Sequence, residues 1–176
     1  KFPNMLRVKL SVVCVSLLAT ALLLTTGCSS TQVDKTATMS PNRIYAEAKE
    51  EIAASQWERA IPLLEKLEAR AAGTPLAQQA QLDKAYAQYK SAESAQALAT
   101  LERFTKLHPV SPAMDYAIYL KGVINFNDDL GLFAKFTRQD LTERDQKASK
   151  ESFEAFKELV DRFPDSRYAA DARLRM

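Results

Sequence analysis

The stretch from Ile44 to Glu68, IYAEAKEEIAASQWERAIPLLEKLE, decides the fold of this 176-residue chain. Its second half and the segment 37 residues later share the i, i+4, i+7 spacing of one apolar helix face: Ala60, Leu64 and Leu67, then Ala97, Leu101 and Phe104. Small residues recur at the same interval in the preceding segments: Ala48, Ala85 and Gly122. A small side chain lets a second helix pack closely, so the sequence predicts repeated pairs of amphipathic helices.

This unit resembles the tetratricopeptide repeat, a helical hairpin of about 34 residues with small residues at fixed positions and a proline near its end. Pro109 and Pro164 take the place of that proline. The resemblance implies an all-α solenoid of tetratricopeptide-repeat hairpins over residues 40–176. We expect about three repeats and the start of a fourth, because the segment after Tyr168 begins another helix. That helix stops at Met176, from which we expect a C-terminally truncated domain.

The third repeat carries an insertion. Gly122 and Ser152 lie 30 residues apart, where the corresponding residues of the first two repeats lie 12 apart. The difference of 18 residues predicts an inserted loop over about 126–144. Apolar surface on a loop often marks a partner site, which makes Leu132, Phe133 and Phe136 candidates for partner binding. The alternative, that the loop folds back and buries its own phenylalanines, stays open.

The N-terminal segment has the order of a secretory signal peptide. The stretch from Leu10 to Leu24, LSVVCVSLLATALLL, is apolar and follows the basic residues Arg7 and Lys9. We therefore expect a signal peptide over residues 1–27. A permanent membrane helix is the weaker alternative, because about 15 apolar residues span about 22 Å of a hydrocarbon core about 30 Å thick.

The end of this segment resembles the cleavage box of bacterial lipoproteins, in which a cysteine follows the cut and receives the lipid. That resemblance implies a lipidated Cys28 and a polar tether over residues 28–39. An incidental thiol beside an ordinary cleavage site is the alternative. Lipoproteins kept at the inner membrane often carry Asp after the cysteine, whereas Ser29 stands here, so the implied location is the periplasmic face of the outer membrane.

Composition and charge exclude several other classes. The chain has 24 Lys and Arg against 22 Asp and Glu, and three of the cations lie in the signal segment, which leaves 24 − 3 = 21 basic residues elsewhere. A nucleic-acid-binding domain needs a surplus of positive charge, so we expect no such partner. One His and two Cys, without a glycine-rich phosphate loop or metal-ligand spacing, predict no catalytic site, cofactor or metal.

The order of these segments, together with the stretch FKELVDRFPDSRYAADARLRM at 156–176, resembles the BamD (ComL) family of outer-membrane β-barrel assembly lipoproteins. The resemblance implies a non-catalytic scaffold beside the barrel-forming subunit BamA and other assembly lipoproteins. It also implies recognition of unfolded outer-membrane proteins through a C-terminal strand that ends in an aromatic residue. Gln146 departs from the family, which tends to have Pro there.

Two other functions remain open. The first is a different lipid-anchored repeat scaffold, such as a secretin pilotin or an envelope division factor. The second is an anchored envelope enzyme whose catalytic part lies beyond this segment.

The first helix of each hairpin lines the groove of tetratricopeptide arrays, so the groove residues follow from the repeat positions. The expected set is aromatic with two cations: Tyr45, Lys49, Tyr86, Tyr89, Lys90, Tyr116, Tyr119 and Phe126. Tyrosine offers an apolar face with a polar tip, which suits an extended peptide, and lysine suits its carboxylate. We expect Trp57 in the core and Tyr168 outside the groove. Packing of each tyrosine between hairpins is the alternative.

Overall fold

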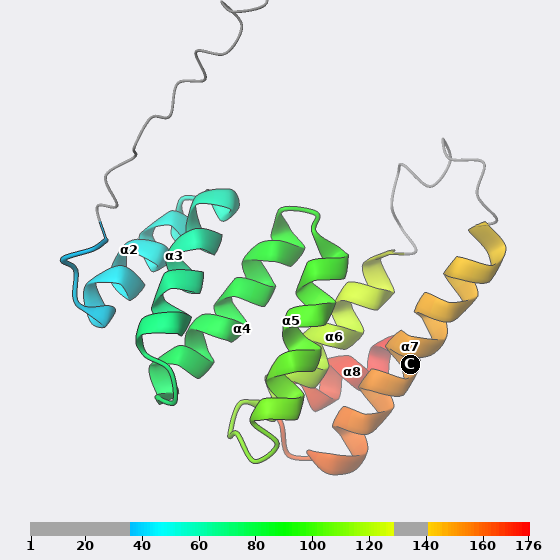
Figure 1. Cartoon of the computed structure of the whole chain (residues 1–176). Helices are drawn as coiled ribbons and strands as arrows, with labels where there is room; N and C mark the ends of the chain where they lie inside the picture. The colour runs from blue at the N-terminus through cyan, green and yellow to red at the C-terminus, as the bar shows by residue number, and fades with distance from the viewer. Residues whose placement is uncertain (1–35, 129–140) are drawn as a thin grey trace, which may run out of the picture. The chain divides into compact units, whose positions relative to one another are not determined.

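The structure is a computed structural model that describes residues 36–128 and 141–176 (Figure 1). Within these ranges every regular element is an α-helix. The signal peptide, most of the tether and the centre of the insertion lie outside the described residues, and with them the predicted lipid site and partner loop: Cys28, Leu132, Phe133 and Phe136. Nothing in the structure therefore tests these four predictions.

The described helices form successive hairpins. The first helices of the hairpins are α2 (Pro41–Ala53), α4 (Pro75–Lys90) and α6 (Met114–Asp128), and the second helices are α3 (Trp57–Arg70), α5 (Ser94–Leu107) and α7 (Leu141–Arg162). A further helix, α8 (Ala169–Arg175), starts a fourth unit. Each helix packs against the next along the chain (Figure 1). This arrangement confirms the predicted all-α solenoid of helical hairpins.

Local sequence fixes where the first helices begin. Ser40 and Thr74 cap α2 and α4, because their side chains accept hydrogen bonds of 3.3 Å from the backbone N–H groups of Arg43 and Ala77. A proline follows each cap at the first helical position, where its missing N–H costs no hydrogen bond. The same device thus starts two consecutive repeats.

The turns inside the first two hairpins are also equivalent. The N–H groups of Gln56 and Glu93 each donate a bond of 2.8 Å to a carbonyl five residues earlier, as in the Schellman motif that ends many helices. The preceding residues, Ser55 and Ala92, have φ angles of 57° and 64°. This left-handed conformation favours glycine, and neither position has one.

The predicted small residues lie where the paired helices meet. Ala48, Ala85 and Gly122 are all buried, together with the apolar stripes of α3 and α5. A Cβ atom at Gly122 would lie 2.5 Å from Cε1 of Phe156 on α7, so the third hairpin needs glycine for this approach. The sequence-based prediction of a close contact at Gly122 is confirmed.

The third hairpin differs from the expected boundaries of its insertion. Helix α6 continues to Asp128 and α7 begins at Leu141, so both ends of the expected 126–144 loop are helical. Despite the added residues, Ser152 Oγ donates a hydrogen bond of 2.9 Å to the carbonyl of Gly122. The pairing predicted from repeat positions is therefore kept across the insertion.

Candidate functional site

The predicted groove residues come from α2, α4 and α6, and we call the surface that they share with α8 the first-helix face. Its predicted aromatic side chains are all half-buried: Tyr45, Tyr86, Tyr89, Tyr116, Tyr119 and Phe126. Each packs one side against a hydrophobic core cluster. The packing alternative for single tyrosines is therefore correct in part, since core contact and an accessible edge occur together.

A buried carboxylate organises the part of this face between α2 and α4. Asp83 is 9% exposed, and its Oδ2 accepts hydrogen bonds from the Tyr45 hydroxyl at 3.0 Å and from Lys49 Nζ at 3.3 Å. Its Oδ1 accepts a third, from Gln79 Nε2 at 3.0 Å. Burial raises the pKa of Tyr45 to about 12, and the neighbouring Asp83 charge adds to the rise. The cation predicted to receive a ligand, Lys49, is thus paired within the chain.

Asp83 is a groove residue that the sequence analysis missed. The repeat positions singled out aromatic residues and lysines and passed over this acid. A signal existed, because Asp83 is the only carboxylate in the sequence of α4 from Pro75 to Lys90. A carboxylate in the middle of a helix that packs against neighbours on both sides indicates a fixed partner, since buried charges are paired.

Three tyrosines stack between α6 and the start of α8. The rings of Tyr119 and Tyr168 lie 4.7 Å apart at an angle of 17°, and the ring of Tyr116 lies 5.5 Å from that of Tyr168. The expectation that Tyr168 lies outside the groove is wrong. The sequence contained no intact fourth repeat from which to place it, whereas in the structure α8 packs beside α7 and brings Tyr168 to α6.

A second carboxylate holds the far end of the stack. The Tyr119 hydroxyl donates to Asp171 Oδ2 at 2.7 Å, and Arg175 Nε donates to the same oxygen at 2.6 Å. Burial, followed by this hydrogen bond, raises the pKa of Tyr119. The hydrogen bond from Arg175, and then that from Tyr119, lower the pKa of the Asp171 carboxyl. The tyrosine rings are consequently fixed in orientation at both ends of the face.

A cavity of about 440 Å³ lies between these two groups. Its walls come from α4, α6 and the turns that precede α6 and α8, and include Asp83, Asp115, Tyr116, Arg167 and Tyr168. Burial, followed by the charge of Asp83, raises the pKa of Tyr116 above the ordinary value of a tyrosine. The cavity therefore combines apolar ring faces with hydrogen-bonding groups and one exposed guanidinium, that of Arg167.

The remaining predicted residues lie at the edges of this face. Trp57, expected in the core, is half-buried, and its ring meets that of Tyr86 edge-on at 5.8 Å. Lys90 Nζ lies 5.8 Å from the centre of the Trp57 ring. Phe126 lies at the start of the insertion, and its ring centre is 6.5 Å from that of Phe156 on α7. The structure thus brings the predicted residues into neighbouring groups on one face.

The described ranges also bear on other kinds of site. Within them, no His, Cys, Asp and Glu side chains gather in a group of three or more that could hold a metal ion. None of the helices there has the length and apolar character required to cross a membrane. Chemically, the first-helix face offers aromatic ring faces together with tyrosine hydroxyls and carboxylates that are hydrogen-bonded to one another.

Comparisons with known proteins agree with this architecture. Residues 32–176 match the family model described as tetratricopeptide repeat. The chain is 47% identical to the outer membrane protein assembly factor BamD of Neisseria gonorrhoeae over 152 residues, which are 86% of this chain and 57% of that protein. It is 50% identical to BamD of Neisseria meningitidis serogroup B over 137 residues, which are 78% of this chain and 51% of that protein.

A more distant relative gives the same result. Outer membrane protein assembly factor BamD of Vibrio cholerae serotype O1 is 38% identical over 156 residues, which are 89% of this chain and 64% of that protein. The chain spans between 51% and 64% of the length of these three relatives. The resemblance that the segment order and motifs indicated is confirmed. The chain therefore belongs to the tetratricopeptide-repeat family, and within that family it is similar to the assembly factors named BamD.

Proposed function

We propose that this chain belongs to a non-catalytic scaffold subunit that assembles β-barrel proteins in the outer membrane. The observation that carries the proposal is the stacked aromatic face, held at both ends by carboxylates, in a chain about half identical to proteins named outer membrane protein assembly factors. A row of half-buried tyrosines suits a partner that is extended and varied in sequence. Unfolded outer-membrane proteins are partners of that kind.

The face would bind the C-terminal strand of such a substrate, with an aromatic side chain against the tyrosine stack. The interactions within the chain alter which cation would meet the terminal carboxylate. Lys49 is paired with the Asp83 carboxylate and Lys90 lies beside Trp57 at the edge of the face, whereas Arg167 lies at the wall of the cavity, where it is exposed and donates a hydrogen bond to the Tyr168 hydroxyl. We therefore assign the carboxylate to Arg167 in preference to Lys49, and keep Lys90 as the second candidate.

Calorimetric titration with a synthetic peptide ending in Phe tests this assignment. The double change Tyr86→Ala and Tyr119→Ala should weaken binding by about 2 kcal/mol, roughly 30-fold, because a few aromatic anchors carry most interface energy. Phe153→Ala is a matched control, since Phe153 is 44% exposed on α7 and is not among the residues that line the cavity. Unchanged affinity in a double variant that keeps its helical circular dichroism would contradict binding at the first-helix face.

The same titration with an amidated peptide separates the role of the carboxylate. If Arg167 binds it, amidation and Arg167→Ala should each reduce affinity, and the two changes together should reduce it no further than either alone. Equal affinity of the free-acid and amidated peptides in the unaltered protein would remove any cation from the proposal, while leaving the aromatic contacts in place.

Membrane attachment through lipidated Cys28 is the second part of the proposal. Several acyl chains on one cysteine give stable anchoring, and the periplasmic face of the outer membrane is the proposed location. Labelling of cells with radioactive palmitate should mark the protein, and Cys28→Ala should abolish both the label and its retention in the outer-membrane fraction. A Cys28→Ala protein that still takes up label would disprove the lipid site.

The third part concerns the partners. Purification of the full-length protein from detergent-solubilised envelopes should bring with it a BamA-type barrel subunit and other assembly lipoproteins. Recovery of a secretin, or of a division protein, without the barrel subunit would instead support one of the alternative scaffolds. A catalytic domain in the full-length chain would support the anchored enzyme.

A further inference from the structure

The turns between successive hairpins lie on one edge of the described helices, which we call the inter-hairpin edge. They join α3 to α4 at residues 71–74, α5 to α6 at residues 108–113, and α7 to α8 at residues 163–168. Figure 1 shows these turns on the same side of the helices, opposite the turn that joins α4 to α5. The fold therefore presents successive inter-hairpin turns on a common surface.

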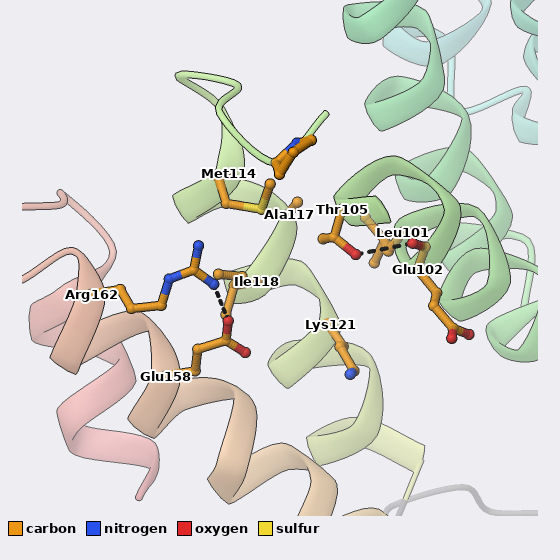
Figure 2. Close-up of a pocket in the computed structure, with 10 residues that line it drawn as sticks. Leu101, Glu102, Thr105, Met114, Ala117, Ile118, Lys121, Glu158 and Arg162 are labelled. Carbon is orange, nitrogen blue, oxygen red and sulfur yellow. Dashed lines mark hydrogen bonds and ion pairs between the residues drawn. The ribbon is translucent and has the colours of Figure 1, made fainter. Parts of the chain in front are cut away.

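The middle turn of this edge exposes two large apolar side chains. Leu107, the last residue of α5, is 62% exposed, and Val110 is 94% exposed. A cleft of about 220 Å³ beside the turn is lined by residues that include Pro109 and Met114, but neither Leu107 nor Val110 is among them (Figure 2). The two side chains thus project into solvent, although space between helices lies close to them.

The repeat does not require apolar residues at these two positions. The equivalent positions of the neighbouring turns carry polar side chains or none: Arg70 and Gly73 before, Arg162 and Asp165 after. The backbone of all three turns is nevertheless the same, because an equivalent N–H group, that of Thr74, Ser111 or Ser166, donates a bond of 3.0 Å to the carbonyl three residues earlier. Exposed apolar residues that the fold does not need indicate a contact outside the chain.

The backbone of the middle turn is suited to an apolar surrounding. Pro109 and Pro112 have no N–H group, and the N–H groups of His108, Ser111 and Met114 donate to backbone carbonyls of the chain. A backbone donor that leaves water without a partner costs free energy. Entry of this turn into lipid therefore leaves few backbone donors unpaired.

The local charges also distinguish the middle turn. Residues 103–114 include no acid, whereas the equivalent segments 66–77 and 158–169 include one and three. Lys106 is 71% exposed directly before Leu107, and its nearest carboxylate is that of Glu102, one helical turn away from the edge. Lysine beside an apolar residue can bury its aliphatic stem and keep its ammonium group among lipid headgroups. Nothing in this segment repels an anionic membrane surface.

The N-terminal segment enters the described structure at the same edge. Arg70, at the end of α3, donates to the carbonyl of Thr36 at 2.6 Å and to that of Met39 at 3.2 Å. Arg70 is the counterpart of Leu107 in the preceding repeat. Cys28 precedes Thr36 by eight residues, which span at most about 28 Å when fully extended. A lipid on Cys28 would therefore keep the inter-hairpin edge within that distance of the bilayer.

We propose that the middle turn of the inter-hairpin edge inserts Leu107 and Val110 into the membrane that holds Cys28. The inference rests on the lipid attachment proposed above, and it adds that this edge faces the bilayer. Two aliphatic side chains that project from a turn suit a fluid bilayer, because lipid needs none of the shape complementarity of a protein interface. Their apolar burial is small, so the contact depends on the tether, which keeps the turn at a high local concentration beside the lipid.

The test anchors the chain weakly, so that the contribution of the turn to membrane binding can be measured. Residues 36–176 form one compact unit, and Cys28 is the only cysteine of the sequence after residue 27. The chain of residues 28–176 is coupled through the Cys28 thiol to a maleimide that carries one palmitoyl chain. One such chain gives only marginal, reversible membrane binding. Sedimentation with vesicles of phosphatidylethanolamine and phosphatidylglycerol then measures the partition coefficient.

Leu107→Ser together with Val110→Ser should reduce the partition coefficient about tenfold. Leu174→Ser is the matched control, since Leu174 is 87% exposed on α8, outside the inter-hairpin turns, and it should leave the partition coefficient unchanged. Chemical coupling makes the result independent of whether cells acylate Cys28. Failure of this inference is therefore distinguishable from failure of the proposed lipid site.

A lipid with a nitroxide in its acyl chain gives a second measurement, on the unaltered side chains. The coupled chain, with ¹³C-labelled leucine and valine methyl groups, is bound to nanodiscs that contain this lipid. The nitroxide should broaden the methyl signals of Leu107 and Val110 and leave those of Leu174 sharp. This measurement places the turn in the membrane without any substitution.

Several outcomes would overturn the inference. Equal partition of the unaltered chain and of the folded double variant would show that the turn does not contact lipid. An equal loss in Leu174→Ser would reveal unspecific apolar adsorption. Self-association without vesicles, abolished by the double substitution, would make a second copy of the chain the occupant. Loss of co-purifying envelope proteins from the full-length double variant, with unchanged partition, would make a protein the occupant instead.

Discussion

The first two hairpins and the third bring their paired helices together with different residues. In the first two, an alanine on the first helix shares a core cluster with a leucine on the second: Ala48 with Leu64, and Ala85 with Leu101. In the third, Gly122 lies beneath Phe156, which stands in the place of those leucines. The smaller residue on one helix is offset by the larger one on the other. Total volume at the contact, not residue type, is what the repeat preserves.

The third hairpin also adds a polar contact that the others lack. Ser152 stands where the first two hairpins have Ala60 and Ala97, and its hydroxyl bonds to the carbonyl of Gly122. Both partners are buried. The hairpin interrupted by the insertion therefore has a hydrogen bond at the same contact where Gly122 meets the Phe156 ring.

The largest expected effect comes from filling the space above Gly122. Gly122→Leu should destabilise the protein by about 3 kcal/mol, because an added side chain meets the buried Phe156 ring and forces α6 and α7 apart. Urea denaturation followed by circular dichroism measures the change. An unchanged unfolding midpoint would show that the two helices do not approach closely at this position.

A compensating pair tests whether volume is the conserved quantity. Gly122→Ala alone should destabilise, whereas Gly122→Ala together with Phe156→Leu recreates the alanine and leucine of the first two hairpins. The double variant should be more stable than the sum of the two single effects predicts, by about 1 kcal/mol or more. Additive effects would mean that the third hairpin cannot adopt the contact used by the other two.

The periodic part of the fold could be predicted from sequence, because the residues that pack the helices together recur at a fixed spacing and the packing recurs with them. The 37-residue spacing of small residues, and the stripe of Ala60, Leu64 and Leu67, located α2 to α5 and the core between them. The boundaries of the insertion could not be predicted in the same way. Residues there depart from the repeat, so spacing alone gives no position for the end of α6 or the start of α7.

The sequence predicted which aromatic residues share the first-helix face, but it did not predict the polar contacts that hold them. Repeat positions placed Tyr45, Tyr116 and Tyr119 on one face, where the structure has them. The hydrogen bonds to Asp83 and the stack with Tyr168 depend on how neighbouring repeats are oriented, which the spacing within one repeat does not contain. Contacts between repeats therefore need the three-dimensional arrangement.

Another prediction concerns the hydrogen bond of the third hairpin. Ser152→Ala should cost about 1 to 1.5 kcal/mol of stability, because a buried bond between neutral groups is lost while the residue keeps nearly the same volume. Thermal unfolding of the two proteins measures this loss of stability. Ser152→Ala also gives the third hairpin the alanine of the other two, so a neutral or stabilising result would show that this hydrogen bond does not contribute to the contact.

A further prediction compares how the two ends of the first-helix face respond to alkali. The pKa of Tyr45 is about 12 in the folded chain, against 10.0 for an unperturbed tyrosine. The folded state thus holds this proton more tightly, and the resulting stability is complete below pH 10 and is lost as pH rises through 12. Since Tyr45 is only half-buried, solvent screening reduces the expected loss to about 1 kcal/mol.

This loss of stability with rising pH can be measured by urea unfolding between pH 9 and about pH 12. The unaltered protein is compared with Tyr45→Phe and Tyr119→Phe. Each variant should lose stability less steeply with pH than the unaltered protein, because the phenol that titrates has been removed. The pKa of Tyr119 is raised in the same direction, so the third hairpin should show the same sign of effect. A parallel pH dependence in all three proteins would contradict the assignment.

The smallest expected effect distinguishes the turns of the first two hairpins. Ser55 and Ala92 adopt left-handed φ angles of 57° and 64°, and side chains with a Cβ are disfavoured there by roughly 1 kcal/mol. Glycine removes that penalty but has more freedom in the unfolded chain, so Ser55→Gly and Ala92→Gly should each stabilise by about 0.5 kcal/mol. The matched control is Ala54→Gly, because Ala54 precedes Ser55 with a φ of −80° and should lose stability when it becomes glycine. Urea denaturation measures the change in the free energy of unfolding for each variant. A gain in stability at Ser55 with a loss at Ala54 would attribute the gain to the left-handed turn. Stabilisation by all three changes would instead show that added flexibility between the helices, and not relief of backbone strain, is the cause.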